Sequence, residues 1–235
     1  MRHFDHMKRL LSIIYCLFVV SVAAFAQVEK TPTRAESWQF AASGDSRNCG
    51  DIVMPTIAQD LTKTNAAFYW HLGDLRAIYD FDEDIKQRPG TRPPTILDYE
   101  NNAWQDLIES QINPFKVPFF VGIGNHETIS PKTRADFIIQ FGDWLNTPVL
   151  QNQRLKDDPN DHKLRTYFHW QRGGVDLIYL DNATTDQFDS AQMRWFNAVL
   201  DRDDADPSIT TIVVGMHEAL PDLSLIHISE PTRPY

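Results

Sequence analysis

Apolar residues gather in short runs along the chain, and a polar motif that begins with glycine follows four of these runs. Short apolar runs bounded by turn residues are typical of buried β-strands. The strands predicted in this way cover residues 38–43, 66–72, 119–123 and 209–214. Between the first two, apolar residues recur at helical spacing over residues 52–63, with Pro55 in the first turn. This strand–helix–strand unit predicts two parallel strands joined by a right-handed crossover.

The rest of the chain continues to alternate helical and extended patterns. Helices are expected over residues 99–112, over residues 132–145, and from a cap at Asp189 or Ser190 to about residue 200. Residues 166–170 and 175–180 predict an antiparallel pair that turns at Gly173 and Gly174. Loops are expected over residues 76–99, as an insertion, and over residues 146–161. Because no linker interrupts this alternation, the sequence predicts one α/β domain.

Each of the four motifs carries a side chain that can bind a metal ion. They are Gly44-Asp45-Ser46-Arg47, Gly73-Asp74-Leu75-Arg76, Gly124-Asn125-His126-Glu127 and Gly215-Met216-His217-Glu218. Polar groups at the carboxyl ends of strands in an open α/β sheet meet in one cleft. Oxygen donors from aspartate and asparagine, joined by histidine nitrogens, suit a divalent transition metal. Taken singly, each aspartate is better explained as a turn or helix-cap residue, and the ordered set of motifs is what favours a metal site.

In this order, the four motifs resemble those of the calcineurin-like metallophosphoesterase superfamily, which includes purple acid phosphatases and 5′-nucleotidases. The resemblance runs from Trp38 to Asp222. It implies an α/β fold, a metallophosphatase-like sandwich of two facing β-sheets flanked by helices, here incomplete at the carboxyl end. It also implies a hydrolase that cleaves phosphomonoesters or phosphodiesters with a metal-activated hydroxide.

The same resemblance implies roles for individual residues. Asp45 would bind a first ion, Asp74 would bridge two ions, and Asn125 and His217 would bind the second. The cofactors would be divalent Mn, Fe or Zn, one or two per site. His126 would give a proton to the leaving oxygen, as a general acid whose ordinary pKa lies near neutral pH. Glu127 would orient His126 and raise its pKa, or would be a solvated loop acid.

Two departures from the family pattern leave other functions open. Arg47 stands where the family usually has a metal-binding histidine, and a guanidinium binds phosphate rather than a metal. Asn182, which follows the predicted strand 175–180, is a second candidate for phosphate binding. The family's final Gly-His-x-His motif does not occur after His217. The alternatives are therefore a non-catalytic phosphate-binding module or an inactive fragment of such an enzyme.

The two ends of the chain have their own signatures. Residues 1–26 combine a basic start, a short apolar stretch and an Ala-Phe-Ala site, which predicts a signal peptide cleaved after Ala26. An uncleaved anchor is the alternative. Residues 27–222 are then the metallophosphoesterase domain, truncated at its carboxyl end. Residues 223–235 resemble the translation of a sequencing adapter, and we expect them to be an artefact. The protein is expected to be exported, as a periplasmic or secreted protein free of the membrane after cleavage.

Composition narrows the choice of partner. The formal net charge is −10 over 235 residues, and loss of residues 1–26 makes it −12. Such an acidic surface repels polyanions, so we expect no nucleic-acid partner and a small phosphorylated substrate instead. Hydrophobic residues make up 42% of the chain, which is enough for a sizeable core. After signal cleavage Cys49 is the remaining cysteine, so no internal disulfide is expected. The oligomeric state stays open.

Overall fold

The computed structural model describes residues 37–86, 94–184 and 188–219. The predicted signal peptide and the predicted carboxyl-terminal artefact lie outside these residues. The contacts within the chain separate Met1–Ser37 from Trp38–Tyr235, and the fold described here belongs to the second unit. Within the described residues, no helix has the length and apolar character needed to cross a membrane.

The first sheet is parallel and holds three of the four predicted motif strands. It is formed by β1 (Gln39–Ser43), β2 (Ala66–His71) and β3 (Phe119–Val121), in that order. Helix α2 (Gly50–Leu61) connects β1 to β2, which confirms the predicted crossover unit. Ser43 pairs with His71, and His71 pairs with Val121. The three strands therefore end level with one another, and the loops that follow them leave the same edge of the sheet.

The second sheet contains the fourth motif strand. Strands β4 (Phe168–Arg172) and β5 (Val175–Tyr179) are antiparallel, as predicted, and the turn between them has positive φ at both Gly173 and Gly174. Helix α8 (Ser190–Ala205) then leads to β6 (Thr211–Gly215), which lies parallel to β5. Asp189 caps α8 by accepting a hydrogen bond from the Gln192 backbone, and the helix extends past the predicted end.

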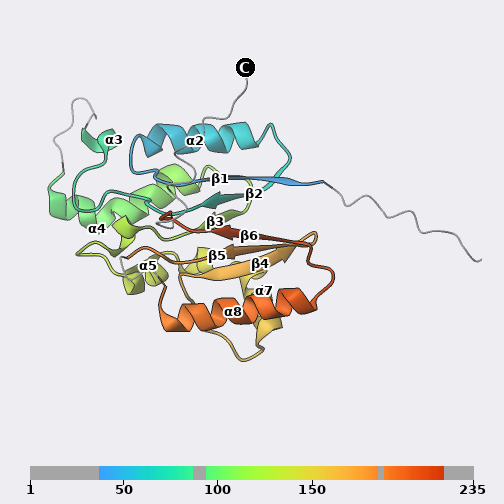
Figure 1. Ribbon diagram of the computed structural model, residues 1–235. Coiled ribbons are helices and arrows are strands. Elements are labelled where there is room, and N and C mark those ends of the chain that lie inside the picture. The colour runs from blue at the N-terminus through green and yellow to red at the C-terminus, as the bar shows by residue number, and fades with distance from the viewer. Residues whose placement is uncertain (1–36, 87–93, 185–187, 220–235) are drawn as a thin grey trace, which may run out of the picture. The chain divides into compact units, whose positions relative to one another are not determined.

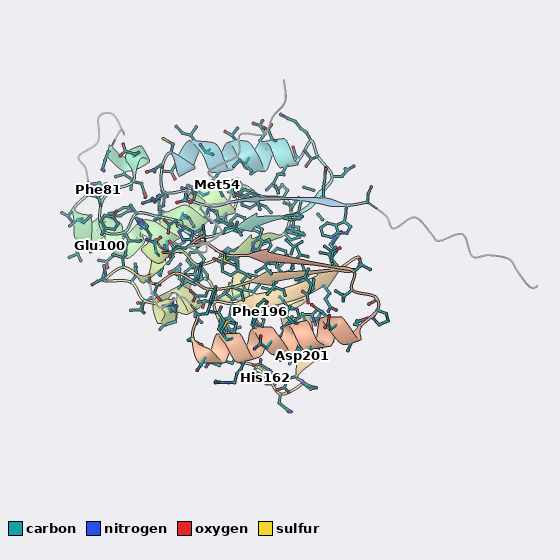
Figure 2. The ribbon with its side chains drawn as sticks, in the orientation of Figure 1. Met54, Phe81, Glu100, His162, Phe196 and Asp201 are labelled. Atoms are coloured by element: carbon teal, nitrogen blue, oxygen red, sulfur yellow. The ribbon has the colours of Figure 1, made fainter. Side chains whose placement is uncertain are left out.

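Aromatic side chains fill the space between the two sheets. Phe120 of β3 stacks on Trp170 of β4 with ring centroids 4.0 Å apart, and Trp70 of β2 meets Trp170 edge-on at 5.1 Å. The sheets approach so closely that a Cβ atom on Gly122 would lie 2.3 Å from the Tyr179 ring. Figure 1 shows α2 on one side of the strands and α8 on the other, and side chains of both helices, such as Met54 and Phe196, are drawn in Figure 2. The chain is therefore an α/β protein with one parallel and one mixed three-stranded sheet.

The remaining helices differ from the predictions at several places. Within the predicted insertion the structure has α3 (Glu83–Lys86), and α4 (Ile96–Leu107) starts earlier than expected before continuing as a π-helical turn, η1 (Ile108–Ile112). The predicted helix 132–145 is interrupted at Phe141, which separates α5 (Arg134–Gln140) from α6 (Gly142–Leu145).

The prediction of a loop over residues 146–161 is wrong, because α7 (Pro148–Asp157) occupies most of it. Thr147 caps this helix by accepting from the Leu150 backbone, and Pro148 stands in its first turn. Only Leu150 and Gln153 of α7 are buried, so the apolar periodicity that announces a helix is nearly absent from its sequence. Packing against β4 and the cap hold this helix in place.

Candidate functional site

The loops that follow β1, β2 and β3 are fastened to one another by their backbones. The Asp45 N–H donates to the Gly73 carbonyl over 2.9 Å. Gly73 has φ of 108°, and a Cβ atom there would lie 2.5 Å from the Gly124 nitrogen, so only glycine fits. Asp45 and Asp74 both adopt φ near 57°, a region that non-glycine residues seldom occupy outside functional sites. These turns aim the two aspartates at the same edge of the sheet.

Glu127, in the short 3₁₀ helix η2 (Asn125–Thr128), joins the second and third loops. Its carboxylate accepts hydrogen bonds from the backbone N–H groups of Gly124, Asp74 and Leu75, over 2.8 to 2.9 Å. Burial and the nearby charge of Asp74 raise the pKa of Glu127 to about 7, against the effect of these three donors. The sequence predicted that Glu127 orients the His126 ring. Among the described residues, its carboxylate instead accepts from backbone N–H groups. It is neither a solvated acid nor the group that orients His126.

Asp74 lies at the centre of the site and is almost completely buried. Its Oδ1 atom accepts a hydrogen bond from the His126 backbone at 3.1 Å and lies 3.1 Å from His217 Nε2. Burial acts to raise its pKa, but the hydrogen bonds from His217 and His126 outweigh burial and hold the pKa of Asp74 below its ordinary value. His217 Nε2 also lies 3.0 Å from Asn125 Oδ1. Three donor atoms predicted to bind metal therefore converge on one point.

Asn182 positions His217 and does not face open solvent. This asparagine is fully buried, and its Oδ1 accepts from the backbone N–H groups of His217 and Glu218 at 3.1 and 3.0 Å. Its Nδ2 donates back to the Glu218 carbonyl. The predicted role of Asn182 in phosphate binding is replaced by a structural one, because both ends of its amide are engaged with the loop that carries His217.

The charge state of His217 follows from these neighbours. Burial disfavours the imidazolium, but the hydrogen bond and charge of Asp74 outweigh burial and raise the pKa of His217. A metal ion binds the deprotonated nitrogen, so a cation would compete with this proton for His217 Nε2. The donor set and its convergence therefore fit one divalent cation.

Asp45 completes this group at its exposed side. One ligand atom each from Asp45, Asp74 and His217 lies within 4.8 Å of the other two. Among the described residues, this is the group of histidine, cysteine or acidic side chains that could hold a metal ion. Exposed Asp45 keeps its carboxylate accessible to solvent. The structure thus brings together Asp45, Asp74, Asn125 and His217, the four predicted metal ligands.

Arg47 and His126 form a pair on the other side of Asp74. Arg47 Nη1 lies 2.6 Å from His126 Nε2, and His126 Nδ1 lies 2.8 Å from the Ala77 carbonyl. A carbonyl only accepts and a guanidinium only donates, so Nδ1 carries the proton and Nε2 presents its lone pair to Arg47. His126 is buried, while about a third of the Arg47 side chain is exposed. The pair leaves the guanidinium in reach of solvent and of Asp74.

Two further residues at the site had no motif to mark them. The exposed Tyr79 ring lies 5.1 Å from the His126 ring and forms part of the rim. His71, taken from the sequence as a strand histidine, is fully buried at the end of β2, where its Nδ1 accepts from the Gly73 backbone. Burial, helped by the charge of His217, lowers the pKa of His71 to about 3. The position of Tyr79 five residues after Asp74 was the one signal available for it.

Arg76 connects the loop that carries Asp74 to three acidic side chains. Its fully buried guanidinium contacts Asp51 at 3.0 Å, Asp106 at 2.8 Å and Asp82 at 3.3 Å. Asp82 in turn accepts from the Ala77 N–H at 2.8 Å, so the residue whose carbonyl contacts His126 is itself hydrogen-bonded to this cluster.

Comparison with known proteins adds no relative to this picture, since neither protein-family models nor curated proteins match the chain.

Proposed function

We propose that this protein is a metal-dependent hydrolase of phosphate esters. The observation that carries the proposal is the convergence of His217, Asp74 and Asn125, which come from three separate loops. Asp74 Oδ1 and Asn125 Oδ1 lie 3.1 and 3.0 Å from His217 Nε2. Exposed Asp45 adds a fourth donor, the third oxygen, at the open side of this group. Carboxylate, amide and imidazole ligands in this combination suit Mn²⁺, Fe²⁺ or Zn²⁺. When bound, such an ion supplies positive charge that offsets the phosphate oxygens and lowers the pKa of a coordinated water.

The side chains of the chain itself account for substrate binding and proton transfer. Arg47, whose side chain is about a third exposed, places its guanidinium beside the metal-ligand candidates, where it can bind phosphate oxygens in bidentate fashion. In hydrolysis the ester P–O bond breaks, a water oxygen bonds to phosphorus, and the alcohol leaves with a proton. His126 would donate that proton through Nε2 after this nitrogen has taken up a proton from solvent, because its Nδ1–H is committed to the Ala77 carbonyl. For this step the guanidinium must move from Nε2 to the substrate.

One observation favours a second candidate, a phosphate-binding module without turnover. The 2.6 Å contact between Arg47 Nη1 and His126 Nε2 occupies the nitrogen from which a leaving group would take its proton. If this contact persists with phosphate bound, Arg47 holds the anion and no proton reaches the ester oxygen.

Hydrolysis assays separate the two candidates. The full chain, loaded with Mn²⁺, should hydrolyse p-nitrophenyl phosphate or bis(p-nitrophenyl) phosphate, and a chelator should abolish the activity. Asp74→Asn should lose metal and activity together, whereas Asp60→Asn, an equal change on the exposed face of α2, should lose neither. His126→Gln should keep the metal and lose rate by about 10²–10⁴-fold. A chain that binds Mn²⁺ and inorganic phosphate but turns over neither ester would instead be the binding module.

A further inference from the structure

The two oxygen atoms of the Asp74 carboxylate face different partners. Oδ1 lies 3.1 Å from His217 Nε2, on the side where Asn125 also points. Oδ2 lies 3.5 Å from Arg47 Nε and 3.6 Å from His126 Nε2. A carboxylate that bridges two cations needs one free side for each of them. In Asp74 one side meets a group of ligand atoms, and the other side meets a guanidinium.

One hydrogen bond and two ion pairs place Arg47 beside Asp74. Its Nη1 atom is held by His126 Nε2 at 2.6 Å, and the ring of His126 is held in turn by the Ala77 carbonyl. Its Nε atom is buried, lacks a hydrogen-bond partner among the described residues, and lies between the carboxylates of Asp74 and Asp45, at 3.5 and 3.8 Å. A guanidinium stays protonated at all ordinary pH values, so it is a permanent positive charge that cannot become a ligand.

We propose that Arg47 takes the place of a second metal ion, so that the site binds a single divalent cation. This inference rests on the proposed function and specifies how many ions it uses. The one cation is held on the Oδ1 side of Asp74 by Asn125, His217 and Asp45. On the Oδ2 side the guanidinium supplies the second positive charge, and it repels any further divalent ion that approaches Asp45 and Asp74. The Asp74 carboxylate then lies between two positive charges, an exchangeable metal ion on its Oδ1 side and the guanidinium of Arg47 on its Oδ2 side.

The test is the number of Mn²⁺ ions that the full chain binds after treatment with a chelator. Isothermal titration calorimetry gives the stoichiometry, and electron paramagnetic resonance distinguishes an isolated Mn²⁺ from an exchange-coupled pair. The unmodified protein should bind about one Mn²⁺ per chain and give the spectrum of an isolated ion. Arg47→His replaces the fixed charge with a neutral nitrogen ligand, and it should bind about two ions and give the coupled spectrum.

Two control variants separate charge from position. Arg47→Lys keeps a positive charge beside Asp74 and should still bind about one ion. Arg172→His makes the same change on the exposed end of β4, where the guanidinium lies over the Trp38 ring, and it should also bind about one. The near-ultraviolet circular dichroism of each variant shows whether it keeps its packed core.

The outcomes distinguish this inference from the proposed function. Two tightly bound, coupled ions in the unmodified protein would overturn the single-ion inference and leave the metal-dependent function standing. A folded Arg47→His variant that still binds only one ion would likewise overturn it, because Arg47 would not be what excludes the second. Absence of any Mn²⁺ binding by the unmodified protein would overturn both.

Discussion

The stability of this protein should fall as the pH rises from about 6.5 to about 9, chiefly because of one buried histidine. His169 of β4 is almost completely buried, and each of its ring nitrogens faces a carboxylate. Nε2 lies 2.5 Å from Asp157 of α7, and Nδ1 lies 2.7 Å from Asp176 of β5. Burial acts to lower the pKa of His169, but the hydrogen bonds to Asp157 and Asp176 raise it to about 9. The folded protein therefore binds a proton that the unfolded chain releases near pH 6.5.

The magnitude follows from the shift in pKa. A group whose pKa is raised by folding contributes its full stability below the unfolded pKa and loses it as the pH rises through the folded pKa. From 6.5 to about 9 the shift corresponds to about 3 kcal/mol of unfolding free energy. Two other charged groups face this cluster from α8. Arg202 lies 3.2 Å from Asp157, and Asp203 has a pKa raised to about 6 by burial and by Asp176, which places its own titration below the window.

Urea unfolding followed by tryptophan fluorescence at pH 6.5, 7.5 and 9 measures this loss. His169→Gln should be less stable at pH 6.5 and should show a much flatter dependence between pH 6.5 and 9. His162→Gln removes an exposed loop histidine, drawn in Figure 2, and should keep the slope of the unmodified protein. If the slope of the unmodified protein is absent, or if His169→Gln retains it in full, the ion cluster around His169 does not govern the pH dependence.

Three further predictions concern the packing around the site. Glu127→Ala leaves three buried backbone N–H groups unpaired and should lower the unfolding free energy by about 3 kcal/mol or more in urea titrations; a loss under 1 kcal/mol would contradict its role as a clamp. Asn182→Ala frees the loop that carries His217, a proposed metal ligand, and should weaken Mn²⁺ binding about 10–100-fold by calorimetry. Unchanged affinity would refute this role of Asn182. Gly122→Ala places a methyl group against the Tyr179 ring and should lower the unfolding free energy by about 1–3 kcal/mol. Gly142→Ala, whose Cβ would lie 3.9 Å from its nearest atom, should be neutral or stabilising. Equal effects of the two changes would argue against close contact between the sheets.

Much of the fold was predictable because strands and amphipathic helices leave local patterns. The motif strands and the hairpin 168–179 were found from apolar runs, and α2 and α8 from helical spacing and a capping residue. Parallel strands that end level with one another place their following loops together, so Asp45, Asp74 and Asn125 could be expected to lie close to one another. His217 follows β6 of the second sheet, and the family resemblance is what placed it with them. Helix α7 was not predicted, because it buries only two residues and its sequence therefore lacks an apolar periodicity. Its cap and its packing on β4 define it.

The sequence by itself determined which side chains stand after which strand, and it predicted that Asp45, Asp74, Asn125 and His217 meet. The packing of the second sheet on the first brings His217 to the other three. Only the tertiary structure decided what those side chains touch. Glu127 reaches backbone groups 52 and 53 positions away, and Arg47 meets His126 across 79 positions. Such contacts depend on the register of the sheet and on the closure of loops with positive φ, which bring distant atoms within hydrogen-bond range. Local periodicity does not encode contacts between residues so far apart in the chain. From sequence, Glu127 was therefore interpreted as the partner of a general acid, and Arg47 as a departure from a motif.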